Sequence, residues 1–520
     1  IADGLSRELC RWGKVAVVYP EAGAGARGSA GASASESAGA TGAAGAAGAS
    51  AGASGVARFG PVLERLERGH DQVVMLCGGD VGGAGWDEFC LARADRIVAL
   101  VDGRDGGEGS PGWSAAVAGG GDKDAAGSIG GGGRVTGSLK GCDLAGYGVE
   151  PGSGALAGWI ERLEPAGVYA IRTEQGWREE DLARTARRLA GRAVGVVLSG
   201  GGARAFAHIG ALEVLLGAGL TVDKVGGVSM GAFVGGLLAM GYGGEQIDAC
   251  CYEEWVRRNP INDYTIPRHS LVRGKKAEAM TERVFGEVGI EELPRPFYCA
   301  SVNLKGNRLV IDRSGPLVEA VKASMSLPLI GPPRRRPNSD ELLIDGSLLD
   351  NLPLAPMSAA GEGPVLAIDV KGGEERVRPG GSGGGPGGAG PRGVPDASGP
   401  PEEPRHAAPE GSTSEERAWR AGVDHTPTPR RPRLPALPET MARIALLSSA
   451  NTDEAARRLA DLAIRVRVPG VGLLEFHQID AAKEAGRAAA LAALEGAPSW
   501  LTGGETGASE LSGRRTVVRV

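Results

Sequence analysis

The serine of the pentapeptide Gly-Val-Ser-Met-Gly at residues 227–231 is a candidate nucleophile. It follows a short apolar run and precedes a stretch, residues 232–240, that can be helical. A Gly-x-Ser-x-Gly turn between a strand and a helix holds a serine hydroxyl on a strained backbone, where larger neighbours would collide. The same pattern surrounds Ser50 and Ser382, but both lie in low-complexity tracts with no strand before them and no amphipathic helix after them. The structural context therefore selects Ser229.

Attack on an ester carbonyl also requires hydrogen-bond donors for the oxyanion that forms. The run Gly200-Gly201-Gly202 follows an apolar strand at residues 194–198 and opens a helix. Without β-carbons its amide groups can converge on one point, and a helix N-terminus favours negative charge. The amide of Met230, which follows the nucleophile, is a further donor. We therefore predict an oxyanion hole formed by Gly200, Gly201, Gly202 and Met230.

A serine hydroxyl also needs a base, and the sequence offers two candidates. His208 is the nearer one, but it lies near the start of a predicted helix at residues 207–216, where a histidine is more often a packing or capping residue. Asp345 ends a short apolar strand and enters an Asp-Gly turn, where a carboxylate can face a site at the sheet edge. The same dipeptide could also be an ordinary turn. Asp345 is the better candidate of the two.

Three motifs, in this order, resemble the signatures of patatin-like phospholipases: Gly-Gly-Gly-Ala-Arg at 200–204, the Ser229 pentapeptide, and Asp-Gly at 345–346. The wider pattern is similar to the branch related to neuropathy target esterase and its bacterial relatives. The stretches that carry this similarity are residues 189–198, 207–210, 323–328, 345–353 and 471–476. The likeness extends from about residue 86 to residue 494, apart from the insertions named below.

The resemblance implies a patatin-like three-layer α/β/α fold with a mostly parallel central sheet. It further implies a catalytic Ser229–Asp345 dyad without a catalytic histidine, acting on a carboxylic ester of a phospholipid or lysophospholipid with no metal and no cofactor. Two positions depart from the family's pattern. Ala205 stands where the first motif usually ends in glycine, which would cost about 1 kcal/mol if that position needs a positive φ. Ser347 follows Asp-Gly where glycine or alanine is commoner.

Arginines offer candidate contacts to a lipid head group. Arg334 and Arg335 follow the apolar residues 327–330, and this apolar-then-basic loop could touch a membrane surface or a lipid phosphate. A solvated charge run is an equally good interpretation. Arg204 could similarly steer a phosphate, or serve as a structural partner of nearby backbone.

Apolar strands alternate with helices around these motifs, which predicts a mostly parallel sheet covered on both faces. The expected organisation is a small α/β region at residues 1–178, a catalytic domain at 193–371, a helix-strand-helix extension packing on it at 439–495, and a tail at 496–520. Tracts at about 21–56, 103–133 and 372–438 are dominated by Gly with Ala, Ser or Pro, and we expect them to be disordered insertions.

Composition narrows the function classes further. The net charge of −6 argues against a nucleic-acid partner, and seven scattered cysteines fit reduced thiols better than a disulfide framework. None of the six histidines has metal-ligand spacing, and no apolar run reaches the roughly 18 residues of a membrane span. The chain starts with Ile1 rather than Met, so we expect a fragment, with any anchor upstream of it. A lipid substrate implies a protein peripheral to membranes on the cytoplasmic side.

Two rival interpretations stay open. The pattern Gly200-x-Gly202-x-x-Ala205 after a strand also fits a dinucleotide-binding loop, which requires an acidic residue about 20 positions on. Asp223 has that distance but precedes the next strand instead of ending it. The second rival is a catalytically silent patatin-like scaffold that binds lipid or a partner.

Overall fold

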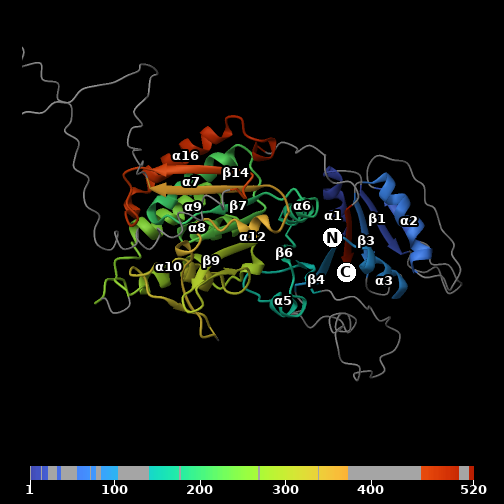
Figure 1. Ribbon diagram of the computed structural model, residues 1–520, viewed down its shortest axis with the longest axis horizontal. Helices are drawn as coiled ribbons and strands as arrows, with labels where there is room; N and C mark the ends of the chain where they lie inside the picture. The colour runs from blue at the N-terminus through green and yellow to red at the C-terminus, as the bar shows by residue number, and fades with distance from the viewer. Residues whose placement is uncertain are drawn as a thin grey trace, which may run out of the picture. The chain divides into compact units, whose positions relative to one another are not determined.

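A computed structural model of the chain describes residues 2–12, 15–20, 32–36, 55–70, 72–77, 84–103, 140–174, 177–266, 270–337, 339–372, 458–502 and 514–519. These residues form two β-sheets with helices on them (Figure 1). Within the described ranges we find no membrane-spanning helix, since none combines the required length with the required hydropathy.

The first sheet has the strand order β2-β1-β3-β15-β4-β5-β6. Its strands are β1 (Val15–Pro20), β2 (Ala32–Glu36), β3 (Gln72–Cys77), β4 (Arg96–Asp102), β5 (Asp143–Tyr147), β6 (Gly167–Ile171) and β15 (Arg514–Arg519). The helices of this part are α1 (Ala2–Leu9), α2 (Gly55–Gly69), α3 (Ala84–Arg93), α5 (Ala157–Leu163) and α6 (Trp177–Leu189). All pairings are parallel except that of β1 with β2.

Two strands of this sheet correct the predicted organisation. β2 lies inside residues 21–56, which we expected to be disordered, and it pairs with the edge of β1. Such pairing uses backbone groups, so an Ala/Ser sequence can supply it. β15 lies inside the predicted tail at 496–520 and is inserted between β3 and β4. Its β-branched pair Val517-Val518 suits a strand, and the first sheet therefore includes chain from both ends of the sequence. Residues 104–133 and 373–438 lie outside the described residues.

The second sheet has the order β11-β12-β9-β8-β7-β13-β14, with β10 also paired to β9. Its strands are β7 (Gly195–Leu198), β8 (Lys224–Val228), β9 (Phe297–Asn303), β10 (Arg308–Asp312), β11 (Arg334–Arg335), β12 (Leu342–Asp345), β13 (Val365–Gly372) and β14 (Leu462–Val468). The helices around it are α7 (Ala207–Gly217), α8 (Met230–Ala239), α9 (Gly244–Cys251), α10 (Lys275–Phe285), α11 (Leu317–Ser324), α12 (Ala355–Ser358) and α16 (Ile479–Leu494). The five strands from β9 to β14 are parallel, whereas β10, β11 and β12 run antiparallel to their neighbours.

Both faces of the second sheet are covered, because its central strands alternate between two apolar clusters. On one face, Val196 and Leu198 pack with α7, α8 and α16. On the other face, Val197 packs with Leu352 and Leu354 just before α12 and with Met357 of α12. The predicted α/β class with a mostly parallel central sheet is confirmed. The segment predicted as an extension at 439–495 is part of the second sheet, because β14 pairs with β13 and α16 lies against α7. The first helix predicted for that extension lies outside the described residues.

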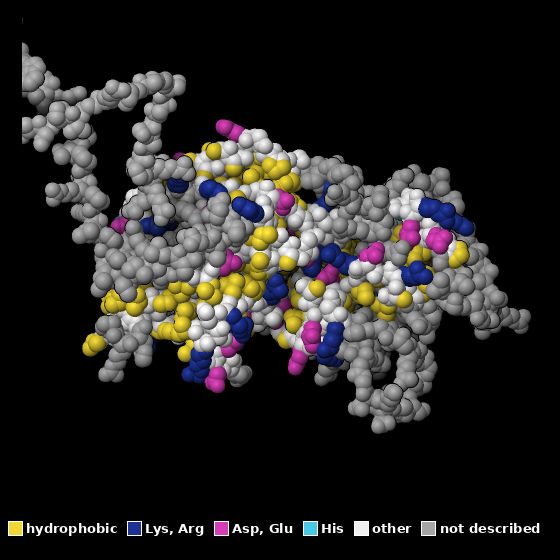
Figure 2. Space-filling view, in the orientation of Figure 1, with side chains coloured by type: hydrophobic (Ala, Val, Ile, Leu, Met, Phe, Trp, Pro, Cys, Tyr) yellow, Lys and Arg dark blue, Asp and Glu magenta, His cyan; other side chains and the backbone are white. Residues whose placement is uncertain are grey.

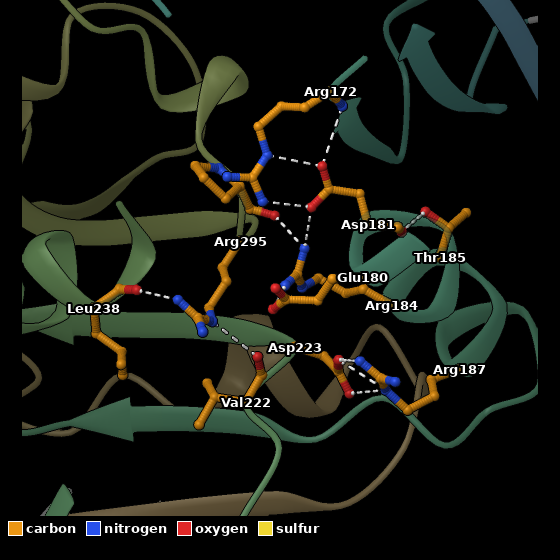
Figure 3. A network of polar contacts seen from close by, with 11 residues as sticks. Arg172, Glu180, Asp181, Arg184, Thr185, Arg187, Val222, Asp223, Leu238 and Arg295 are labelled. Atoms are coloured by element: carbon orange, nitrogen blue, oxygen red, sulfur yellow. Dashed lines mark hydrogen bonds and ion pairs between the residues drawn. The ribbon is translucent and has the colours of Figure 1, made fainter. Parts of the chain in front are cut away.

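A polar network ties α6 to the amino end of the second sheet (Figure 3). Asp181 on α6 accepts hydrogen bonds from Arg172 and Arg184, and Arg184 also donates to the carbonyl of Pro294, just before β9, at 2.8 Å. Arg187 pairs with Asp223, which precedes β8, at 2.6 Å. Buried charges of opposite sign therefore hold the start of the sheet in register with α6.

Candidate active site

Ser229 lies in the turn between β8 and α8. Its backbone has φ 55°, the left-handed region that a side chain rarely adopts. A β-carbon at Gly227 would lie 2.6 Å from the Gly231 carbonyl oxygen, and one at Gly231 would lie 2.4 Å from the Leu198 oxygen. Both glycines of the pentapeptide are thus required by close backbone contacts.

A second serine stabilises the strained turn. The Ser229 amide donates a hydrogen bond to the Ser324 hydroxyl oxygen at 2.9 Å, and that hydroxyl donates to the carbonyl of Ala300 on β9 at 2.6 Å. Ser324 ends α11 and is fully buried. Sequence reasoning gave it no role. The one sequence feature that could have pointed to it is the Ala-Ser-Met-Ser stretch at 323–326, which is part of the similarity to the family.

Asp345 lies at the end of β12 and meets Ser229 across β9. Val228 pairs with Ala300 on one side of β9, and Asp345 pairs with Ser301 on the other. This register brings two residues 116 positions apart into contact, and the Ser229 hydroxyl donates to Asp345 Oδ2 at 2.6 Å. Ser347 donates to the other oxygen, Oδ1, from its amide at 2.9 Å and from its hydroxyl at 2.6 Å. The carboxylate is thereby fixed with one oxygen facing the serine.

Burial raises the pKa of Asp345 to about 6, and the hydrogen bonds from Ser229 and Ser347 oppose that rise. The carboxyl has no accessible surface, and it forms no ion pair with any residue that the structure describes. A carboxylate without a nearby cation in a dry site is a stronger base than an exposed one, and it is still mostly ionised at neutral pH.

The glycine loop supplies fewer free amides than predicted. The amide of Gly200 donates to the Asn351 carbonyl at 3.3 Å, so we correct the prediction that it contributes to an oxyanion hole. Gly201, Gly202 and Met230 line the cavity that contains Ser229. Gly202 and Met230 are the first residues of η2 (Gly202–Phe206) and α8, where amides lack an acceptor inside the helix.

The C-terminal segment holds this loop in place. Gly202 has φ 56°, and a β-carbon there would lie 2.2 Å from the carbonyl oxygen of Leu473. The same oxygen accepts the amide of Ala203 at 2.8 Å. Ala205, the departure from the family's pattern, is absent from the residues with positive φ and is fully buried. Alanine therefore carries no backbone strain at that position.

The two other candidate polar residues serve the fold. His208 is buried, its Nε2 lies 2.8 Å from the carbonyl oxygen of Ser199, and burial lowers its pKa to about 4. It does not line the cavity of Ser229. Asp223, which a dinucleotide site would need free, accepts bonds from Arg187 and from the amide of Val194.

None of the three predicted arginines lies at the cavity of Ser229. Arg204 donates to the carbonyl of Val471 at 2.7 Å. Arg334 pairs with Glu278 at 3.4 Å and Arg335 with Asp340 at 3.7 Å. Arg334 and Arg335 line a separate cavity, and their contact with a membrane surface or a lipid phosphate stays a prediction.

The cavity beside the dyad is apolar and small, about 80 Å³. Apart from Ser229, Asp345, Ser347, Gly201, Gly202 and Met230, its lining consists of apolar side chains: Trp255, Ile261, Met325, Leu327, Ile330, Leu473, Leu474 and Phe476. Trp255 stacks on Phe476 with ring centroids 4.6 Å apart. Such a lining suits an acyl group, and no cluster of potential metal ligands occurs within the described ranges.

Comparison with known proteins gives the site a context. Residues 196–358 match the family described as patatin-like phospholipase. An uncharacterised NTE family protein of Mycobacterium tuberculosis is 32% identical over 445 residues, which cover 85% of this chain and 65% of that protein. The lysophospholipase nte1 of Emericella nidulans is 32% identical over 339 residues, covering 63% of this chain and 19% of that protein. The human patatin-like phospholipase domain-containing protein 6 is 35% identical over 198 residues, covering 37% and 14%.

The matched segment contains Ser229, Asp345 and the glycine loop. It matches the patatin-like phospholipase family, and the resemblance inferred from the three motifs is confirmed. The relatives include an NTE family protein, so the expected branch is confirmed as well. The chain spans 65% of the length of the mycobacterial relative.

Proposed function

We propose that this chain is a serine hydrolase that cleaves a carboxylic ester of a lysophospholipid or phospholipid, with Ser229 as nucleophile and Asp345 as base. The observation that carries the proposal is the 2.6 Å hydrogen bond from the Ser229 hydroxyl to a buried carboxylate. The apolar cavity next to it, and a fungal relative named as a lysophospholipase, support a lipid ester as substrate.

The proposed reaction has two halves. Ser229 Oγ attacks the ester carbonyl carbon while its proton passes to Asp345, and the amides of Gly201, Gly202 and Met230 stabilise the oxyanion. The bond from the carbonyl carbon to the glycerol oxygen then breaks, and that oxygen takes the proton from Asp345. In the second half, a water molecule gives a proton to Asp345 and attacks the acyl-enzyme. The proton returns to Ser229 as the fatty acid leaves.

Labelling with a fluorophosphonate probe tests the nucleophile. We expect covalent labelling of the native chain, complete loss in Ser229→Ala, and retention in Ser382→Ala, which removes a serine in the same Gly-x-Ser-x-Gly pattern. Absence of labelling in a chain that is demonstrably folded would favour the alternative, a catalytically silent scaffold that binds lipid. Product analysis on mixed phospholipids and lysophospholipids then separates the two substrate classes.

A further inference from the structure

Large apolar side chains are exposed on two loops next to the candidate active site. Tyr264 is 70% exposed, Ile266 83% and Leu329 42%. Isolated apolar residues are common on protein surfaces, but a group of them at one place indicates an interaction. We call these three residues the apolar ledge.

The ledge lies next to residues that line the cavity, although none of its own three side chains lines it. Ile261, a few residues before Tyr264, lines the cavity, and so do Leu327 and Ile330 on either side of Leu329. The two loops are joined by backbone hydrogen bonds: Leu271 donates to Leu329 at 2.8 Å, Val272 to Ile330 at 3.0 Å, and Thr265 to Leu271 at 3.0 Å. The exposed residues are therefore held as one bonded unit at the cavity. Figure 2 shows hydrophobic side chains gathered at the lower left of the molecule, around the region labelled α10 in Figure 1.

Leu329 combines an exposed side chain with an unfavourable backbone conformation. Its φ of 72° is in the left-handed region, where glycine or asparagine is at lower free energy. A leucine that is strained and also exposed contributes little to folding, so a partner that buries its side chain would explain its presence.

Basic residues follow the ledge directly. Arg273, Lys275 and Lys276 are all exposed. Among the residues that the structure describes, Arg273 and Lys275 form no ion pair, and Lys276 bonds to the amide oxygen of Asn262 at 2.6 Å. The carboxylate of Asp263 lies close by and accepts the amides of Gly274 and Lys276. Glu278, one turn after Lys275 on α10, is paired with Arg334. The three cations therefore outnumber the one carboxylate beside them that has no cationic partner among the described residues, and the border of the ledge is positively charged.

The small size of the cavity indicates what the apolar ledge would contact. At about 80 Å³ it is far smaller than the roughly 300 Å³ of pockets that enclose a drug-sized ligand. It can hold the ester end of a lipid, while the rest of the acyl chain must lie along the surface outside. An apolar surface with a basic border beside the entrance matches a bilayer that carries anionic head groups.

We propose that the apolar ledge inserts into the surface of a bilayer containing anionic phospholipid and places the cavity directly against it. Arg273, Lys275 and Lys276 face the head groups, and Tyr264, Ile266 and Leu329 enter the outer acyl region. The use of this contact rests on the proposed function, because a lipid ester then reaches Ser229 without crossing water.

Flotation with vesicles tests binding without catalysis. The full chain carrying Ser229→Ala is mixed with phosphatidylcholine vesicles, either pure or with roughly 30% phosphatidylglycerol. We expect binding to the anionic vesicles, at least about tenfold weaker binding when Ile266→Asp is added, and a smaller loss with Leu329→Asn, which suits a positive φ. Arg273→Glu with Lys275→Glu should weaken binding to anionic vesicles only. The matched control is Leu491→Asp on α16, where the side chain is 57% exposed and lies outside these loops.

The proposal is overturned if the Ser229→Ala chain does not float with anionic vesicles, or if Leu491→Asp weakens binding as much as Ile266→Asp. Kinetics separates it from the proposed function. With Ser229 restored, Ile266→Asp should leave hydrolysis of a water-soluble short-chain ester unchanged and lower hydrolysis of vesicle phospholipid about tenfold. Equal losses on both substrates would make the ledge a structural part of the site and refute it as a membrane contact. A native chain that binds vesicles but cleaves neither substrate would refute the hydrolase and leave the ledge supported.

Discussion

The two ends of strand β8 use buried carboxylates in opposite ways. Before the strand, the carboxylate of Asp223 is 1% exposed and receives the guanidinium of Arg187 at 2.6 Å. At the other end, beside Ser229, Asp345 of β12 is equally buried, but its hydrogen bonds come from the hydroxyls of Ser229 and Ser347 and from the Ser347 amide, all neutral. The first carboxylate is neutralised and holds α6 to the sheet, whereas burial raises the pKa of the second to about 6. The comparison shows that the partner, and not burial alone, separates a structural aspartate from a candidate base.

The largest expected effect comes from Asp345→Asn. Without a proton acceptor, hydrolysis of a short-chain ester should fall by about a thousandfold. Because the native fold must bury an ionised group at pH 8, the same change should raise the free energy of unfolding by up to about 3 kcal/mol. Ester turnover and urea unfolding of the same preparation measure both effects. Near-normal turnover would show that the base is misassigned.

Arg187→Met, at the other end of β8, should lower the stability and leave the activity unchanged, which is the opposite of the result expected for Asp345→Asn. It leaves the Asp223 carboxylate buried without its cation, so we expect a loss of about 3 kcal/mol of stability with unchanged turnover per folded molecule. The double variant with Asp223→Asn should recover part of that loss, because the unpaired charge is removed. If Arg187→Met lowered turnover of a folded chain by orders of magnitude, the two ends of β8 would not be functionally separate.

The smallest effect concerns pH. Activity should rise with pH through a midpoint of about 6 as Asp345 ionises. Because its folded pKa is raised, the stability linked to this group is fully present below its ordinary pKa and is lost as pH rises through about 6.

Ser347→Ala removes a hydrogen bond that lowers the pKa of Asp345, so the midpoint of the activity profile should move upward, by about one unit at most. A profile whose midpoint is the same in Ser347→Ala would contradict the role given to this serine, and Arg187→Met serves as the control that should not shift it.

Much of the fold and of the dyad could be predicted from local sequence. The apolar runs before Gly200 and Ser229 are strands, and the helices that follow are where the pattern places them. Helices α9, α10 and α11 were not predicted. Their weaker local patterns become helices through packing, as with Phe285 of α10 against Phe233 of α8.

The supports of the site were harder to predict because they depend on distant pairings. Ser324 meets the Ser229 amide from 95 positions away, and the Asn351 carbonyl occupies the amide of Gly200. Strand β15 is part of the first sheet, although its segment was predicted to be a C-terminal tail. Pairings of this kind depend on which strand edges are left open once the rest of the chain has folded, and no local pattern encodes that.

The order of the glycine loop, the serine turn and the Asp-Gly turn was determined by sequence alone, because each motif needs particular residue types to form its backbone. Only the tertiary structure decided which amides stay free, which carboxylate lacks a cation and which apolar residues stay exposed beside the cavity. These properties depend on what each group contacts across the sheet, and such contacts exist only once β8, β9 and β12 are in register.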